Sequence, residues 1–261
     1  MTFVMQIHAT STYYGTYARL LVIFIISALL AYFIPYYGSD ALEGFFSFNA
    51  VNIGILYAIT IGFLMTIAIN RKQALDSYIS LELNKIRRMY HLTKHLHAIT
   101  PGTTQWFNTI DKAITAYLRA FKRRDFRDYE QGNALHRKIT YAIYGLPKIV
   151  KNYNSDIYGA LLDAAASATE AREYIRSTKE ASLGYSQWFV TLTTTSVFAF
   201  IIIAASPMQI MTRTIAGTVV FCLLLMLQLL YEYDRANQKK RHFYTGLYVQ
   251  NEAIMKRNDK A

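Results

Sequence analysis

Residues 52–97 read NIGILYAITIGFLMTIAINRKQALDSYISLELNKIRRMYHLTKHLH. The first part, 52–70, carries no charged side chain, and the second part, 71–97, is basic with apolar residues spaced three and four apart. Neither proline nor glycine stands where the two parts meet. A run of about 18 to 20 apolar residues crosses about 30 Å of hydrocarbon as a helix, and three-and-four spacing is typical of an amphipathic helix. The stretch therefore predicts one helix that leaves a membrane and continues into the cytoplasm.

Three other runs, residues 20–37, 188–205 and 215–231, also contain no charged side chain. The whole chain is 53% hydrophobic and 17% charged, which is more apolar than an ordinary soluble domain. Helices of this length in a soluble protein usually carry a polar stripe, whereas helices in lipid satisfy their own backbone polar groups. We predict an all-α protein with four transmembrane helices and a helical cytoplasmic domain inserted between the second and the third.

The net charge of +11 is unevenly distributed along the chain. Residues 38–49 hold two acidic residues and no basic one, whereas residues 71–186 have a surplus of lysine and arginine. Because basic segments stay on the cytoplasmic side, we expect a multi-pass protein of the inner membrane with both termini in the cytoplasm. The expected segments are a first transmembrane hairpin at 1–70, a helical cytoplasmic region at 71–186, a second transmembrane hairpin at 187–234 and a cytoplasmic tail at 235–261.

Local sequence signals suggest where the helices end. Pro101 and Gly102 predict a break after the long helix. We expect the first span at about 17–36, followed by a short outer link from Gly38 to Phe48. A helix from about Ser155 to Gly184, with an alanine face, is expected to lead without a break into the third span.

The apolar half of the opening stretch carries two stripes. Small residues recur every four positions at Gly54, Ala58 and Gly62. Apolar side chains recur beside them at Ile55, Ile59, Phe63 and Ile67. Small residues let another helix approach closely, so one stripe could pack on a neighbouring helix while the other faces lipid. Alternatively, the apolar stripe, repeated by symmetry-related subunits, forms the hydrophobic constriction of a pore, with Arg71 and Lys72 as a positive ring at the inner mouth.

The third span is rich in threonine, at Thr191, Thr193, Thr194 and Thr195. Threonine hydroxyls in a helix commonly bond to carbonyls of the preceding turn. The alternative is a polar face that lines a water-filled path.

Side chains for catalysis are not grouped in this sequence. It has no glycine-rich phosphate loop, no Gly-x-Ser-x-Gly turn and no His-Glu-x-x-His helix, and Cys222 is the only cysteine. His91 and His95 could share a helix face, but His97 lies off it, so we expect no metal site and no other cofactor. We expect neither an enzyme nor a nucleic-acid partner.

Glu82 on the long helix, and Glu170, Arg172 and Glu173 on the helix from Ser155, are candidates for a charge pair between the two helices. A surface pair contributes only about 0–1 kcal/mol. We therefore expect this pair to set the register of the helices at most.

The layout resembles the bestrophin-like family of prokaryotic four-span membrane proteins. The resemblance covers roughly residues 18–236, and the residues that carry it are Gly62-Phe63, Glu82, Arg87-Arg88, Ala171-Arg172 and the run Tyr231 to Arg235. It implies a homo-oligomeric channel, typically pentameric, in which the second helix lines the pore and the apolar stripe forms its neck. The chain lacks the proline-containing motif of the bestrophin pore helix and the acidic calcium-binding cluster after the fourth span, so calcium gating is not expected.

Together these observations predict a homo-oligomeric membrane ion channel that conducts anions, with the lipid bilayer, further copies of the chain and inorganic ions as its partners. The alternative is a non-conducting multi-pass membrane protein whose cytoplasmic helical domain binds a partner or senses the membrane. The oligomeric state, and the residues at its symmetry axis, would discriminate between the two.

Overall fold

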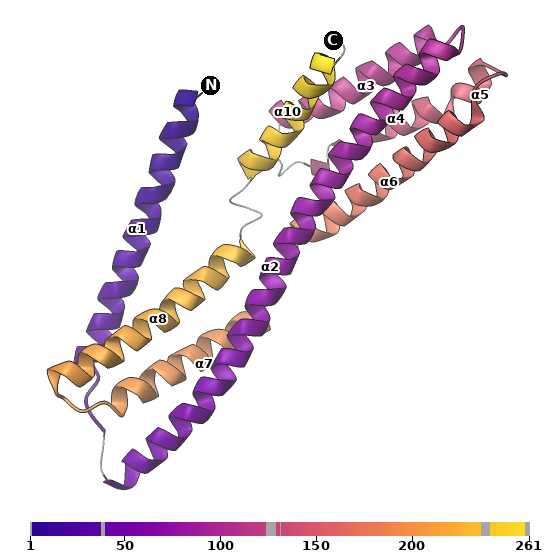
Figure 1. Cartoon of the computed structure of the whole chain (residues 1–261). Helices are drawn as coiled ribbons and strands as arrows, with labels where there is room; N and C mark the ends of the chain where they lie inside the picture. Colours follow the sequence, from indigo (N-terminus) through magenta and orange to yellow (C-terminus); the bar gives the residue numbers. More distant parts are fainter. Residues whose placement is uncertain (1, 38–39, 124–128, 131, 236–240, 259–261) are drawn as a thin grey trace. The chain divides into compact units, whose positions relative to one another are not determined.

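The computed structural model describes the whole chain except residues 1, 38–39, 124–128, 131, 236–240 and 259–261. The described residues are helical with short connections and contain no β-strand, which confirms the all-α prediction. The helices, shown in Figure 1, are α1 (Thr2–Phe33), α2 (Asp40–Ile99), α3 (Thr104–Arg123), α4 (Asn133–Tyr144), α5 (Leu146–Ile149), α6 (Ser155–Lys179), α7 (Tyr185–Ala204), α8 (Ile210–Asp234) and α10 (Arg241–Asn258).

Helix α2 is one unbroken helix of 60 residues, as the uninterrupted pattern of residues 52–97 predicts. It ends at Ile99, and the following turn contains Gly102 with a φ of +81°, a conformation that glycine adopts readily. The predicted outer link from Gly38 to Phe48 is wrong, because α2 already begins at Asp40. No proline lies between Asp40 and the apolar run, so nothing stops the helix from extending backward.

The prediction of an unbroken passage from the helix at Ser155 into the third span is also wrong. Helix α6 ends at Lys179, and α7 begins at Tyr185 after an extended Gly184. A contact distant in sequence holds this break: the Leu183 amide donates a hydrogen bond to Asp234 Oδ1 at 2.7 Å. The Trp188 indole donates to the other carboxylate oxygen at 3.2 Å. A local helical pattern cannot reveal a carboxylate about fifty residues away.

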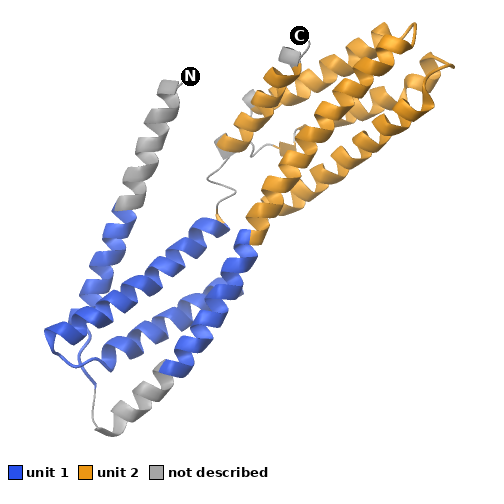
Figure 2. Ribbon diagram, in the orientation of Figure 1, with its two compact units in different colours: residues 1–69, 182–234 blue, residues 70–181, 235–261 orange. Residues whose placement is uncertain are grey.

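The chain forms two compact units (Figure 2). Unit 1 comprises residues 1–69 and 182–234, and unit 2 comprises residues 70–181 and 235–261. Helix α2 contributes its first part to unit 1 and its second part to unit 2. The tail, expected as a segment of its own, lies in the same unit as residues 70–181.

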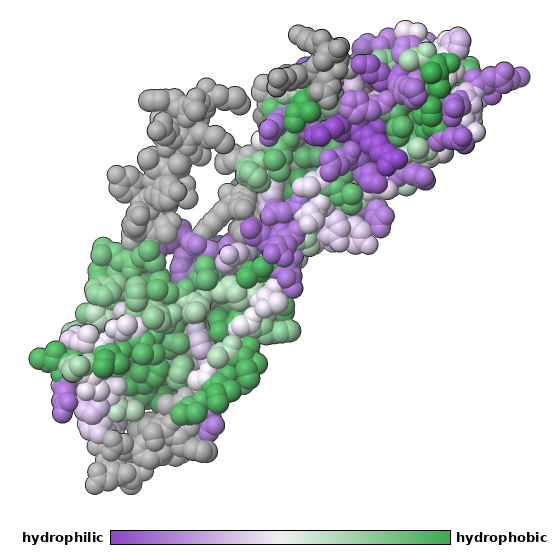
Figure 3. Space-filling view, viewed as in Figure 1, coloured by the Kyte–Doolittle hydropathy of each residue, from purple (hydrophilic) through white to green (hydrophobic). Residues whose placement is uncertain are grey.

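Unit 1 presents an apolar surface, and Figure 3 shows hydrophobic residues over most of its described visible face. Among the described residues, α7, α8 and the part of α2 from Val51 are long and apolar enough to cross a membrane. In α1, the segment Ala18–Phe33 is apolar but shorter than these three helices. Such a surface suits a hydrocarbon environment, because in water it would expose many large apolar side chains to the solvent.

The core of unit 1 joins α2 to α7 and α8. Its α2 side is formed by Tyr57, Ile61, Leu64 and Ala68. These residues pack with Ala199 and Ile203 of α7 and with Val220 and Leu223 of α8. The Tyr57 hydroxyl also donates a hydrogen bond to the Leu223 carbonyl at 3.2 Å. One face of α2 is therefore occupied within the chain.

The core of unit 2 is larger and gathers side chains from α2, α3, α4, α6 and α10. Its surface is more hydrophilic than that of unit 1 (Figure 3). Helix α6 contributes the small residues Ala164, Ala165 and Ala168, all buried, as the alanine face of the sequence indicates. Small side chains allow helices to pack closely.

Candidate functional site

The first candidate is the face of α2 that unit 1 leaves exposed. Ile55 is 55% exposed, and Ile59 and Phe63 are each 65% exposed. Because successive residues of a helix are rotated by about 100°, these three lie opposite Tyr57 and Leu64, which are buried. Ile67 lies at the edge of this face and is half-buried. Three of the four stripe residues, Ile55, Ile59 and Phe63, therefore lie on a side of α2 that the described residues leave exposed, whereas Ile67 packs against the core of unit 1.

The small residues Gly54, Ala58 and Gly62 have different surroundings. A Cβ added at Gly54 would lie 2.9 Å from Phe198 Cζ of α7, so the absence of a side chain allows this ring to approach. Phe198 also packs on Tyr57, with ring centroids 5.8 Å apart. In contrast, Ala58 is exposed and a Cβ at Gly62 would meet no atom of the described chain within 4 Å. Among the described residues, Gly54 is therefore the glycine of this stripe that lies against a neighbouring helix, and Gly62 is not.

The basic residues expected at the inner mouth follow in the same helix. Arg71 and Lys72 are both half-buried. The Lys72 ammonium lies 3.9 Å from Asp76 Oδ2, one helical turn further on. Its charge is therefore partly balanced by a carboxylate.

Arg213 lies in the first turn of α8 and is buried. Its Nη1 donates hydrogen bonds to the carbonyls of Ala31 at 3.1 Å and Ile34 at 2.8 Å. Its Nη2 lies 3.0 Å from Met208 Sδ. A cation at the end of α1 satisfies carbonyls that have no partner within the helix and opposes the negative end of the helix dipole. The signal that could have revealed it was a single arginine just ahead of an apolar run.

The threonines of α7 bond within their own helix. Thr191, Thr194 and Thr195 donate to the carbonyls of Gln187, Val190 and Thr191, at 2.7, 2.8 and 2.7 Å. This confirms the first of the two interpretations of this cluster for these three residues. The hydrogen atoms of these three hydroxyls are therefore used within the helix.

The second candidate is a polar network inside unit 2. The Glu82 side chain is completely buried, and three tyrosine hydroxyls donate hydrogen bonds to it. Tyr117 of α3 contacts Oε1, whereas Tyr129 at 2.8 Å and Tyr248 of α10 at 2.5 Å contact Oε2. Burial, and then the charge of Glu82, raises the pKa of all three tyrosines well above 10. The three phenols therefore stay protonated and serve as donors.

Arg172 of α6 completes this network. Its Nη1 lies 3.4 Å from Glu82 Oε1, so the expected charge pair forms, but in the core and not at the surface. The same nitrogen contacts the Tyr117 hydroxyl, and Nη2 donates to the Tyr129 carbonyl at 2.7 Å. Nε donates to Asn133 Oδ1 at 2.8 Å. A buried charge needs such a set of partners, because it has lost its water.

His136 of α4 lies against this network and was not anticipated. It is buried, its ring is 5.7 Å from that of Tyr117, and its Nε2 makes no hydrogen bond. Burial, together with the positive charge of Arg172, lowers the pKa of His136 to about 4. The imidazole is therefore neutral at ordinary pH.

The histidines that the sequence singled out do not meet. His91 and His95 are exposed, whereas His97 Nδ1 is 2.9 Å from the Thr103 hydroxyl and its ring stacks on Phe107. Within the described residues, no three side chains of the kinds that bind metals come together.

Helix α10 is attached to unit 2 by polar contacts besides Tyr248. The Tyr244 hydroxyl donates to Asp76 Oδ1 at 2.7 Å. Asn251 accepts from Arg87 Nη2 at 2.7 Å and donates to the Leu83 carbonyl at 3.2 Å. Helix α10 is thus fixed along α2 by specific pairs.

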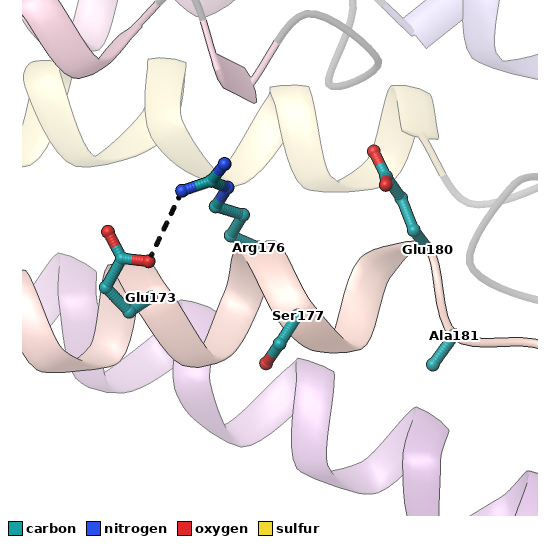
Figure 4. A pocket seen from close by; sticks show the side chains of 5 residues that line it. All are labelled: Glu173, Arg176, Ser177, Glu180 and Ala181. Atoms are coloured by element: carbon teal, nitrogen blue, oxygen red, sulfur yellow. Dashed lines mark ion pairs between the residues drawn. The ribbon is translucent and has the colours of Figure 1, made fainter.

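A hollow near the end of α6, shown in Figure 4, is lined by Glu173, Arg176, Ser177, Glu180 and Ala181. Arg176 lies 3.7 Å from Glu173 and 2.9 Å from Glu130, and Glu180 lies 3.5 Å from Lys179. These charges are already paired, so the hollow offers no clear chemistry.

Comparison with known proteins identifies the family of this chain. The family model described as the Bestrophin-like domain matches residues 18–237, most of the chain. The chain belongs to the Bestrophin-like family. It is accordingly a membrane protein with several apolar helices. No curated protein matches this bestrophin-like chain.

Solved structures share the fold. A bacterial bestrophin homologue from Klebsiella pneumoniae, carrying one substitution, is 15% identical with a TM-score of 0.70, over 91% of this chain and 99% of that one. A second structure, described as a membrane protein with one substitution, is also 15% identical with a TM-score of 0.70, over 91% and 98% of the two chains. At this identity the likeness establishes the fold alone.

Several residues that carried the resemblance to the bestrophin-like family lie in the interior of unit 2. Glu82 and Arg172 form its buried ion pair, and Arg87 binds Asn251 of α10. These positions therefore hold the unit together.

Proposed function

We propose that the protein is a homo-oligomeric ion channel of the inner membrane that conducts anions, with α2 lining the pore. The observation that carries the proposal is the exposure of Ile55, Ile59 and Phe63 in the apolar stripe of α2, opposite the face that packs inside unit 1. Membership in the Bestrophin-like family supports it.

The stripe has the properties of a hydrophobic constriction. Ile55, Ile59, Phe63 and Ile67 follow each other one turn apart and span about 18 Å of helix. No charged residue interrupts α2 between 51 and 69. A narrow ring of such side chains opens and closes a pore by admitting or excluding water.

A pore of this kind requires several copies of the chain. One helix face cannot enclose a path, whereas copies related by a rotation axis place the same face around a centre. We infer a pentamer, as the resemblance implies, with four spans per subunit and both termini in the cytoplasm.

Selectivity for anions follows from charge. The chain has a net charge of +11, and Arg71 and Lys72 follow the apolar stripe in the same helix. Rings of arginine or lysine at a pore mouth favour anions. Arg71 and Lys72 would therefore concentrate anions at the inner mouth of the pore.

Reconstitution tests the proposal. The purified chain is inserted into planar bilayers, and chloride and potassium currents are recorded for the wild type and for Phe63→Ala. Phe189→Ala is the matched control, because Phe189 of α7 is 71% exposed but lies on another helix. We expect a chloride current that Phe63→Ala increases and Phe189→Ala leaves unchanged. If neither the wild type nor Phe63→Ala carries current, the protein is not a channel, and a monomer or dimer would then favour a non-conducting partner-binding protein.

A further inference from the structure

A hollow lies on the surface of unit 2 between α3 and α4, and neither the buried network nor the proposed pore uses it. Its volume is about 560 Å³. This lies within the range of about 300–1,000 Å³ that is usual for small-molecule sites. Its lining includes Ala113 and Ala116 from α3 and Leu135 and Ala142 from α4.

The hollow exists because the facing side chains are small. Alanine leaves space between two helices that larger residues would fill. The helices are held together beneath it, since Ile110 and Ile114 of α3 and Ile139 of α4 are completely buried in the core of unit 2. The alanine and leucine side chains that line the hollow therefore form an apolar floor on two packed helices.

Two cations flank this floor. Lys112 on α3 and Lys138 on α4 both line the hollow and are exposed. No carboxylate is among the lining residues, and neither lysine forms an ion pair with a described residue. The exposed ring of Tyr141 adds further apolar surface at the edge.

We propose that this hollow binds an amphipathic anion with a single alkyl chain, a free long-chain fatty acid. The alkyl chain lies on the alanine and leucine floor, because burying apolar surface is favourable. The carboxylate pairs with Lys112 and Lys138, neither of which forms an ion pair with a described residue. Neither an uncharged lipid nor a cationic amphiphile satisfies both features.

Trp106 provides a direct signal for this site. Its indole nitrogen donates a hydrogen bond to the carbonyl of Ala142, which lines the hollow, at 2.7 Å. The chain has two tryptophans, so Trp188→Phe leaves Trp106 as the only one. A brominated fatty acid in the hollow would quench its fluorescence.

The experiment titrates the full-length Trp188→Phe protein in lipid nanodiscs with dibromostearate. The test variant carries Lys112→Gln and Lys138→Gln. The matched control carries Lys148→Gln and Lys151→Gln, two exposed lysines outside the hollow, and so loses the same charge. A third variant, Ala116→Leu, fills the hollow without changing charge.

We expect saturable quenching in the parent and in the control, displaced by stearate but not by a cationic amphiphile with an equal chain. The Lys112→Gln/Lys138→Gln variant should bind about tenfold more weakly, and Ala116→Leu should lose saturable quenching. Equal quenching in all variants would mean that the fatty acid only partitions into the bilayer, and it would overturn the proposal. Equally tight binding of a hexaglutamate peptide would also overturn the proposal. If the lysine variant changes its oligomeric state and the parent does not bind fatty acid, the occupant is a second copy of the chain, which would overturn it as well. This test does not depend on current through the protein.

Discussion

Arg172 and Glu82, 90 residues apart in the chain, form an ion pair whose side chains are only 4% and 0% exposed. Their charged atoms are 3.4 Å apart, and three tyrosine hydroxyls complete the shell of the carboxylate. Through these contacts α2, α3, α6 and α10 converge on one carboxylate. The pair is therefore the polar centre of unit 2.

Replacing Arg172 by methionine should destabilise unit 2 by about 3–5 kcal/mol, because it leaves the Glu82 charge buried without its partner. Arg176→Met is the control, since Arg176 is 56% exposed in its ion pairs and should cost about 0–1 kcal/mol. Denaturant unfolding followed by Trp106 fluorescence, in the Trp188→Phe background, measures both. The double variant Glu82→Gln/Arg172→Met should be more stable than Arg172→Met, and equal stability would show that the charge itself is not the cause.

Tyr248→Phe should loosen α10. The substitution removes a donor to a buried carboxylate, a bond that contributes about 1.5–3 kcal/mol. Limited proteolysis should then cleave the tail faster than in the wild type. Tyr141→Phe, on the exposed face of α4, should not change the rate. Equal rates for all three proteins would mean that Tyr248 does not hold the tail.

His136 makes unit 2 sensitive to acid. Its pKa is about 4 in the folded protein, against an ordinary value of 6.5. Between these values the unfolded chain binds the proton and the folded chain does not, so stability falls as the pH drops from 6.5 toward 4. The loss approaches about 3 kcal/mol at the lower end.

Unfolding free energies at pH 7 and pH 4.5 measure this effect. His136→Asn should reduce the difference in unfolding free energy between pH 7 and pH 4.5. The substitution His91→Asn, at an exposed position, should leave that difference as in the wild type. An unchanged pH dependence in His136→Asn would assign the effect to other groups.

Gly54 and Gly62 should respond differently to the same substitution. Gly54→Ala places a methyl group 2.9 Å from the Phe198 ring and should cost about 1 kcal/mol, because the ring must move. Gly62→Ala meets nothing in the described chain within 4 Å and should leave the stability of the isolated subunit unchanged or slightly higher. Thermal melts in detergent compare the two, and equal losses would contradict the packing described for α7.

The sequence was sufficient to predict the continuous α2, the break at Gly102 and the apolar character of α7 and α8, because each depends on local pattern. It could not locate the break before α7, which depends on Asp234, or the start of α2 at Asp40. In the network, Glu82 and Arg172 were recognisable as charges, but the tyrosines and His136 were not. Their roles come from three-dimensional convergence, which leaves no spacing in the sequence.

In the proposed channel, the apolar stripe of α2 faces a water-filled path for ions. Cysteine at Phe63 tests it most directly, because Cys222 is the only native cysteine and can be removed by Cys222→Ala. In that background the chloride current of Phe63→Cys is recorded before and after a charged methanethiosulfonate reagent. We expect the current to change within seconds in Phe63→Cys and not in a Phe189→Cys control. A steady current in Phe63→Cys whose cysteine is shown by mass to be modified would contradict it.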